Sequence, residues 1–173
     1  MLAAVAATDI TGIPRDMIKN AVESYETMHQ RMEYMGKFDG AKVYVDYGHH
    51  PTQIDVTLKA LKNITKEKLY CICQPLTYNR LKSLLKQFSE VFYAADKVYV
   101  VDIYTSRESK DDTIHSKHLV DLLNKNGVDA TYLSSFKDVK NEIKGKITPS
   151  DSIIGFVTGS VEEFSESLVE EEK

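Results

Sequence analysis

The sequence of 173 residues is 42% apolar and 28% charged and has a formal net charge of −4, which is ordinary for one globular domain with its own hydrophobic core. The negative balance argues against electrostatic binding of nucleic acid or of an anionic membrane, and no apolar segment approaches the roughly 20 residues of a membrane span. The first ten residues lack a basic stretch, so we expect no signal peptide there.

Two helical segments open the chain. Residues 2–8 are rich in alanine, and residues 14–25 repeat apolar side chains at helical spacing, with Ile18, Val22 and Tyr25 on one face. Residues 29–39 have a mixed character, and we interpret them as one or two short edge strands.

Strand and helix patterns alternate through the rest of the chain. The predicted strands are residues 41–46, 68–73, 97–103, 129–133 and 152–157, and the predicted helices are residues 51–63, 79–93, 115–126, 136–143 and 161–169. This alternation predicts an α/β fold with right-handed crossovers. We expect a three-layer, Rossmann-like open sheet, mostly parallel, with helices on both faces.

The two cysteines of the chain, Cys71 and Cys73, lie in the predicted strand of residues 68–73. We interpret them as buried small hydrophobes. We expect them to point to opposite faces of the strand and therefore not to pair easily. Unpaired thiols favour a reducing cytoplasm as the compartment of this protein.

Polar side chains follow three successive predicted strands. The first set is Asp46, Tyr47, His49 and His50, the second is Gln74, Tyr78, Asn79 and Arg80, and the third is Asp102, Tyr104, Arg107 and Glu108. Neighbouring parallel strands would bring these turns to one edge of the sheet, where α/β proteins bind ligands. The alternative is that polar residues simply occupy loops.

The residue types at this edge favour an anionic ligand over a metal ion. His49 and His50 stand at a helix start, which offers free N–H donors, and no carboxylate or cysteine at a recognisable spacing completes a metal site. Asp46 could cap the turn or bind a ribose hydroxyl, and residues 158–160 are a weaker candidate for a phosphate site. The residues by themselves thus predict an α/β domain with a candidate anion site.

Several segments resemble the C-terminal domain of the Mur ligases. They read VDYGHHPTQI from Val45, QPLTYNRLKSLLKQF from Gln74 and AADKVYVVDIYTSRE from Ala94, and LAAVAAT, QRMEYMG and SIIGFVTGSVEEF extend the likeness over residues 2–164. The resemblance implies an amide-forming ligase of peptidoglycan precursor synthesis. Such an enzyme makes an acyl phosphate from a muramate carboxylate and ATP, with Mg²⁺, before an amine attacks it. Its substrates would be UDP-N-acetylmuramate and an amino acid, with L-alanine expected.

The resemblance also implies that two parts of the chain have different roles. Residues 1–28 are expected to be the helical end of a central ATPase domain that binds most of ATP and Mg²⁺. Residues 29–173 are expected to be the C-terminal domain that closes over nucleotide and amino acid, and to be inactive alone, with no catalytic residue and no metal site of their own. By position, Arg31 and Asp46 would contact the nucleotide, and Tyr47, His49 and Arg80 the amino acid.

One departure from the family pattern leaves the acceptor amino acid open. Leu76 stands where the family usually has a histidine of the amino-acid pocket, so another acceptor than L-alanine is conceivable. Two other kinds of protein also stay open. One is a free-standing domain that binds a nucleotide or an amino acid without catalysis, and the other is a structural or regulatory remnant.

Overall fold

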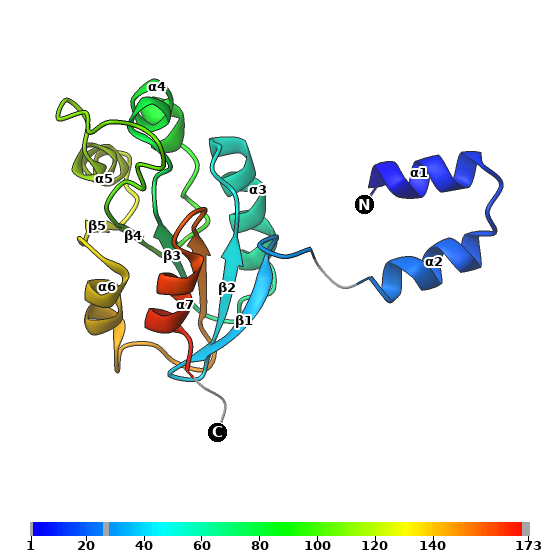
Figure 1. The fold of residues 1–173 in the computed structure, drawn as a ribbon. Helices are drawn as coiled ribbons and strands as arrows, with labels where there is room; N and C mark the ends of the chain where they lie inside the picture. The colour runs from blue at the N-terminus through cyan, green and yellow to red at the C-terminus, as the bar shows by residue number, and fades with distance from the viewer. Residues whose placement is uncertain (1, 26–27, 171–173) are drawn as a thin grey trace.

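The computed structural model describes residues 2–25 and 28–170, which form a pair of helices followed by an α/β body (Figure 1). In chain order the elements are α1 (Leu2–Ile10), α2 (Arg15–Glu23), β1 (Glu33–Phe38), β2 (Ala41–Asp46), α3 (Pro51–Lys62), β3 (Leu69–Cys73), α4 (Tyr78–Phe88), β4 (Lys97–Val100), α5 (Ser116–Lys125), β5 (Ala130–Tyr132), α6 (Phe136–Ile143), β6 (Ser152–Phe156) and α7 (Val161–Leu168). Each helix and strand predicted from the sequence is present.

Six strands form one sheet in the order β1-β2-β6-β3-β4-β5. The edge strand β1 runs antiparallel to β2, and the other neighbours are parallel. The prediction of a mostly parallel open sheet with an edge strand between residues 29 and 39 is therefore confirmed.

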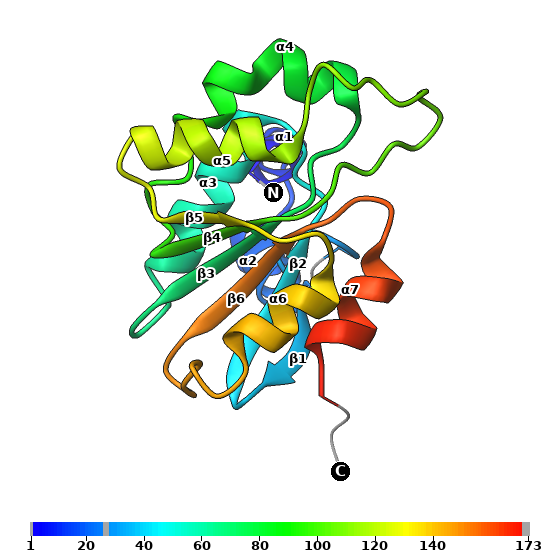
Figure 2. The ribbon, with the colours of Figure 1, turned by 90° about the vertical axis from the view of Figure 1, so that its left-hand side faces the viewer.

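The two faces of the sheet are covered by different helices. Figure 2 shows α3, α4 and α5 on one face and α6 and α7 on the other. Apolar side chains such as Leu58, Leu81 and Leu119 form the core under the first three helices. Phe136 and Phe164 belong to the core under α6 and α7, where their rings meet edge to face with centroids 5.5 Å apart. This arrangement is the predicted three-layer fold.

The expected orientation of the cysteines was wrong. Cys71 and Cys73 lie in the same core cluster, under α3, α4 and α5, and Ile72 between them lies in the other. Side chains two positions apart in a strand share a face, because the side-chain period of a strand is two. Burial raises the pKa of the Cys73 thiol to about 12 and that of Cys71 well above its ordinary value, so both behave as small hydrophobes.

Two elements, α4 and β4, end three or more residues before their predicted bounds. Helix α4 ends at Phe88, where the Ser89 hydroxyl donates to the Lys86 carbonyl and the Ser89 carbonyl accepts from Asn126 Nδ2. These bonds replace the next helical turn. Strand β4 ends at Val100, after which the chain lies along residues 74–77 through a parallel bridge between Leu76 and Tyr104.

The helices α1 and α2 form a pair of their own. They contact each other, and Arg15 at the start of α2 pairs with Asp9 of α1 at 3.0 Å. In Figure 1 the pair stands apart from the α/β body, and neither core cluster of that body includes one of its residues. None of the helices in the described part of the chain is long and apolar enough to cross a membrane.

Candidate functional site

Asp46, the last residue of β2, organises the turn that follows it. Its carboxylate is buried, and Oδ1 accepts from the Gly48 N–H at 2.6 Å while Oδ2 accepts from the Met32 N–H at 2.9 Å. A Cβ atom at residue 48 would lie 2.8 Å from Asp46 Oδ1, so the close approach requires glycine. Asp46 thus caps its turn, one of the two roles considered from the sequence, and also ties the turn to the segment before β1.

Three of the other predicted site residues form a cluster beside Asp46. The Arg31 guanidinium lies over the Tyr47 ring at 5.5 Å from its centroid. The His49 ring meets Tyr47 edge to face, with centroids 5.4 Å apart, and its Nδ1 lies 3.0 Å from the Tyr47 carbonyl oxygen. Arg31 and Tyr47 are both exposed. The structure therefore brings Arg31, Asp46, Tyr47 and His49 together at the end of β2.

The neighbouring imidazole, that of His50, caps the helix that follows. Its Nδ1 accepts from the Thr52 N–H at 3.3 Å, and Gln53 Oε1 accepts from the His49 and His50 N–H groups at 3.2 Å each. This is a capping box at the start of α3. Of the two imidazoles considered for an anionic ligand, only His49 is free of this capping role.

Arg80 lies in a separate part of the same sheet edge. It belongs to the first turn of α4, which follows β3, and strand β6 lies between β2 and β3. The three polar turns were expected to be direct neighbours, and that detail was wrong, because the turn of residues 158–160 after β6 stands between the first two. The ring of Tyr104 covers this turn, since a Cβ at Gly159 would lie 2.1 Å from it.

Three buried side-chain polar atoms of the described residues lack a hydrogen-bond partner within the protein. They are Gln74 Oε1, Arg80 Nη1 and Thr158 Oγ1. All three lie just beyond the carboxyl ends of β3 and β6 or in the helix that follows β3. Buried polar atoms are nearly always paired, and leaving one unpaired costs about 1–3 kcal/mol. The unpaired buried polar atoms of the described residues are thus all located at this edge of the sheet.

The sequence placed Gln74 in the second strand-end polar set and Thr158 in the weaker phosphate candidate, but the resemblance assigned neither residue a role. Gln74 directly follows β3, and Thr158 is the second residue after β6. A polar residue at the end of a strand is also the signal that pointed to Asp46. Gln74 also links the two turns, because its Nε2 lies 3.4 Å from Ser160 Oγ. Their burial without a partner is a property of the folded chain and is not visible in the sequence.

Two hollows open at this edge. A groove of about 820 Å³ runs between Gln30 and the turn of residues 158–160, and a cavity of about 280 Å³ adjoins Gln74, Tyr104 and Ser135. The acidic side chains of Glu162, Glu163 and Glu166 line the larger groove, which disfavours a phosphate at residues 158–160. In the described residues, no group of three His, Cys, Asp or Glu side chains is placed to hold a metal ion.

Comparison with known proteins shows what this chain is similar to. Residues 30–160 match the family described as Mur ligase, glutamate ligase domain. The UDP-N-acetylmuramate–L-alanine ligases of Caldanaerobacter subterraneus subsp. tengcongensis and Acetivibrio thermocellus are each 37% identical to this chain over 172 residues, which is 99% of the chain and 37% of each relative. The chain thus spans little more than a third of the length of these curated relatives.

A solved structure shows the same fold. The UDP-N-acetylmuramate-alanine ligase of Thermotoga maritima superposes with a TM-score of 0.75 at 21% identity, and the match covers 95% of this chain and 35% of that one.

Proposed function

Because the chain belongs to the Mur ligase, glutamate ligase domain family, we propose that it is the C-terminal domain of an ATP-dependent ligase that joins an amino acid to UDP-N-acetylmuramate in peptidoglycan precursor synthesis. The observation that carries the proposal is the carboxyl edge of the sheet, with its unpartnered Gln74, Arg80 and Thr158 atoms. The alignment of 99% of this chain with two UDP-N-acetylmuramate–L-alanine ligases supports this proposal and favours L-alanine as the acceptor.

The helix pair supports a division between residues 1–28 and residues 29–173. Ile10, Met17 and Tyr25 are 86%, 59% and 50% exposed, and large apolar side chains exposed close together usually mark a contact surface. In our proposal it packs within a central ATPase domain, of which α1 and α2 are the end. That domain would bind most of ATP and Mg²⁺, and the assembled enzyme would work in the cytoplasm.

The proposed roles follow from the two parts of the site. Arg31 and Asp46 would face the nucleotide, and each Asp46 oxygen can accept a second hydrogen bond beside the one that it already has. Tyr47 and His49 would line the amino-acid pocket. Arg80 would hold the carboxylate of the amino acid, since a guanidinium fork matches a carboxylate and Nη1 has no partner among the described residues.

The domain's contribution to the reaction would be positioning. Groups that hold the acceptor amine near the acyl phosphate convert a bimolecular encounter into an oriented attack. Fixed donors at the sheet edge would also stabilise the charge of the reacting phosphate and carboxylate groups. ATP with Mg²⁺ supplies the activation of the muramate carboxylate when bound.

The test is amino-acid-dependent release of ADP by the full-length protein. With ATP, Mg²⁺ and UDP-N-acetylmuramate present, we expect ADP to form when L-alanine is added, and glycine, L-serine and D-glutamate measure the acceptor preference that the change to Leu76 leaves open. No ADP release with any amino acid would contradict the proposal.

The 173-residue chain supplies a second arm of this test. We expect no turnover, and calorimetry should detect ATP or L-alanine binding only on the order of millimolar Kd or weaker, because part of each site lies elsewhere. Submicromolar binding of either compound would instead favour a free-standing binding domain.

A further inference from the structure

Helix α4, which carries Arg80, begins without a cap of its own. The preceding residue, Thr77, makes no side-chain capping bond and has a φ of 63°, a conformation that is rare for a β-branched residue. The first N–H groups of any helix need acceptors from elsewhere. The start of α4 therefore depends on another part of the chain.

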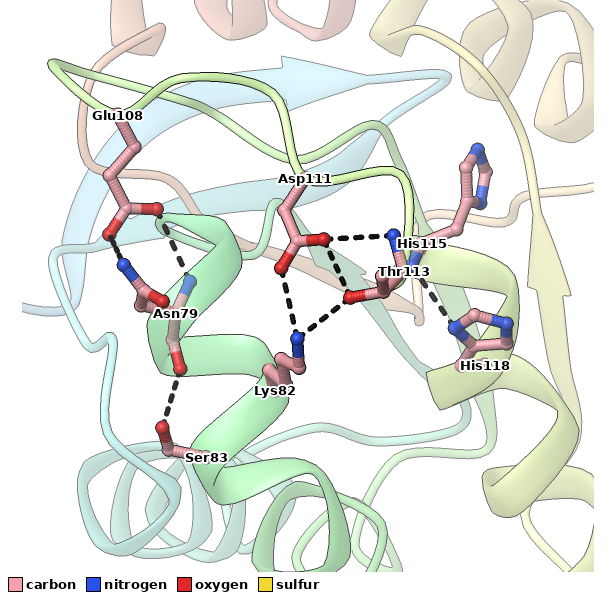
Figure 3. Close-up of polar contacts among 8 residues, drawn as sticks. All are labelled: Asn79, Lys82, Ser83, Glu108, Asp111, Thr113, His115 and His118. Carbon is pink, nitrogen blue, oxygen red and sulfur yellow. Dashed lines mark hydrogen bonds and ion pairs between the residues drawn. The ribbon is translucent and has the colours of Figure 1, made fainter.

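Glu108 supplies the missing cap from the loop after β4. Its Oε2 accepts from the Asn79 N–H at 3.2 Å, and its Oε1 accepts from Asn79 Nδ2 at 3.0 Å (Figure 3). Burial raises the pKa of Glu108, but the hydrogen bonds from Asn79 and the Tyr78 N–H outweigh burial and hold the pKa below its ordinary value. Glu108 is thus an ionised carboxylate at the positive end of a helix, where a negative charge is stabilising.

A second contact holds the same loop to the next turn of α4. Lys82 Nζ lies 3.1 Å from Asp111 Oδ2 and donates to Thr113 Oγ1 at 2.7 Å (Figure 3). Asp111 Oδ1 in turn accepts from the Thr113 hydroxyl and N–H at 2.6 and 2.9 Å. The loop therefore bonds to α4 at residues 79 and 82, on both sides of Arg80 in the sequence.

We propose that Glu108 is a positioning residue for the acceptor amino acid: by capping α4 from the neighbouring loop, it fixes the helical turn from which Arg80 reaches the acceptor carboxylate. This inference rests on the proposed function, because it takes Arg80 as the carboxylate-binding group. A binding group displaced by about 1 Å loses much of its effect, so loss of the cap should weaken acceptor binding although Glu108 itself touches no substrate.

The kinetic test compares three variants of the full-length protein. For Glu108→Ala we expect the KM of the amino acid to rise about 10-fold, with the KM of ATP and of UDP-N-acetylmuramate within about twofold of wild type. Glu108→Gln keeps an acceptor for Asn79 and should restore most of the loss. Asp112→Ala is the matched control, because Asp112 is exposed in the same loop and pairs only with Lys110 among the described residues. An unchanged amino-acid KM in Glu108→Ala, or an equal rise of all three KM values, would overturn the proposal.

Amide hydrogen exchange in the 173-residue chain tests the same idea without any turnover. Glu108→Ala should speed exchange at the N–H groups of Tyr78 and Asn79, which bond to Glu108, by about 10-fold or more and leave the amides of β6 unchanged. Unchanged exchange at Tyr78 and Asn79 would overturn the positioning role. If wild-type full-length protein shows no amino-acid-dependent turnover, the proposed function fails, whereas normal wild-type turnover with an unchanged KM in Glu108→Ala rejects only the role of Glu108.

Discussion

The two ends of the parallel strands differ in whether all of their buried polar atoms have hydrogen-bond partners. At the amino edge the buried carboxylate of Asp151 is fully used: Oδ1 accepts from the Lys68 N–H at 2.9 Å, and Oδ2 accepts from the Thr148 N–H and hydroxyl at 2.8 and 3.0 Å. At the carboxyl edge, Gln74 and Thr158 have buried oxygens without partners among the described residues, although each oxygen of Asp46 at the same edge already accepts a bond. We infer that the polar groups at the amino edge stabilise the fold and that the unpartnered atoms at the carboxyl edge are kept for a ligand.

The largest effect on stability is expected at the amino edge. Asp151→Ala should lower the free energy of unfolding by about 3 kcal/mol, because it leaves the Lys68 and Thr148 N–H groups without their acceptor in a buried turn. Urea denaturation of the 173-residue chain measures this change. A loss below about 1 kcal/mol would show that the amino edge does not depend on this carboxylate.

A matched pair of threonines tests the contrast most evenly. Thr148→Val removes a hydroxyl that donates to Asp151 and should cost about 1 kcal/mol. Thr158→Val removes an unpartnered buried hydroxyl and should leave the free energy of unfolding unchanged or raise it by up to about 1 kcal/mol. Equal losses in the two variants, again by urea denaturation, would mean that the Thr158 hydroxyl serves the fold.

The smallest effect on stability is expected from acid titration of Asp111, in the loop that bonds to α4. The Thr113 hydroxyl and N–H, followed by Lys82, lower the pKa of Asp111 from 3.8 to about 2. Because the folded pKa is the lower one, the stabilisation is present in full above about pH 4 and is lost as the pH falls towards 2. Asp111→Asn should therefore flatten the pH dependence of unfolding in this window, and an unchanged slope would contradict the assigned contacts.

Elements with strong local signals could be predicted from the sequence. The expected bounds of β2 and α6 coincide with the observed Ala41–Asp46 and Phe136–Ile143. Each has a clear local boundary, since a tight turn follows Asp46 and the Ser135 hydroxyl caps α6 by accepting from the Asp138 N–H. The alternation of strands and helices was sufficient to predict the layered fold.

Features that depend on distant parts of the chain could not be predicted. The last strand, β6, inserts between β2 and β3, and no local pattern specifies that pairing. For the same reason the sequence placed the turns after β2 and β3 side by side.

The site itself was predictable only in part. The strand-end motif led to Asp46, Tyr47 and His49, which do lie together with Arg31. The cap on α4 comes from Glu108, which is 29 residues away from Asn79 in the sequence, and the missing partners of Gln74 and Thr158 depend on how the folded chain buries them.

In our proposal, side chains at the carboxyl edge of the sheet bind substrate. The most direct test of this role is the KM of the acceptor amino acid for the Arg80→Met variant of the full-length protein. Methionine keeps an unbranched side chain and removes the guanidinium. Loss of a charge-assisted hydrogen bond to the acceptor carboxylate predicts a KM raised on the order of 10- to 100-fold with kcat largely retained. An unchanged KM, or a fall in kcat alone, would contradict the account.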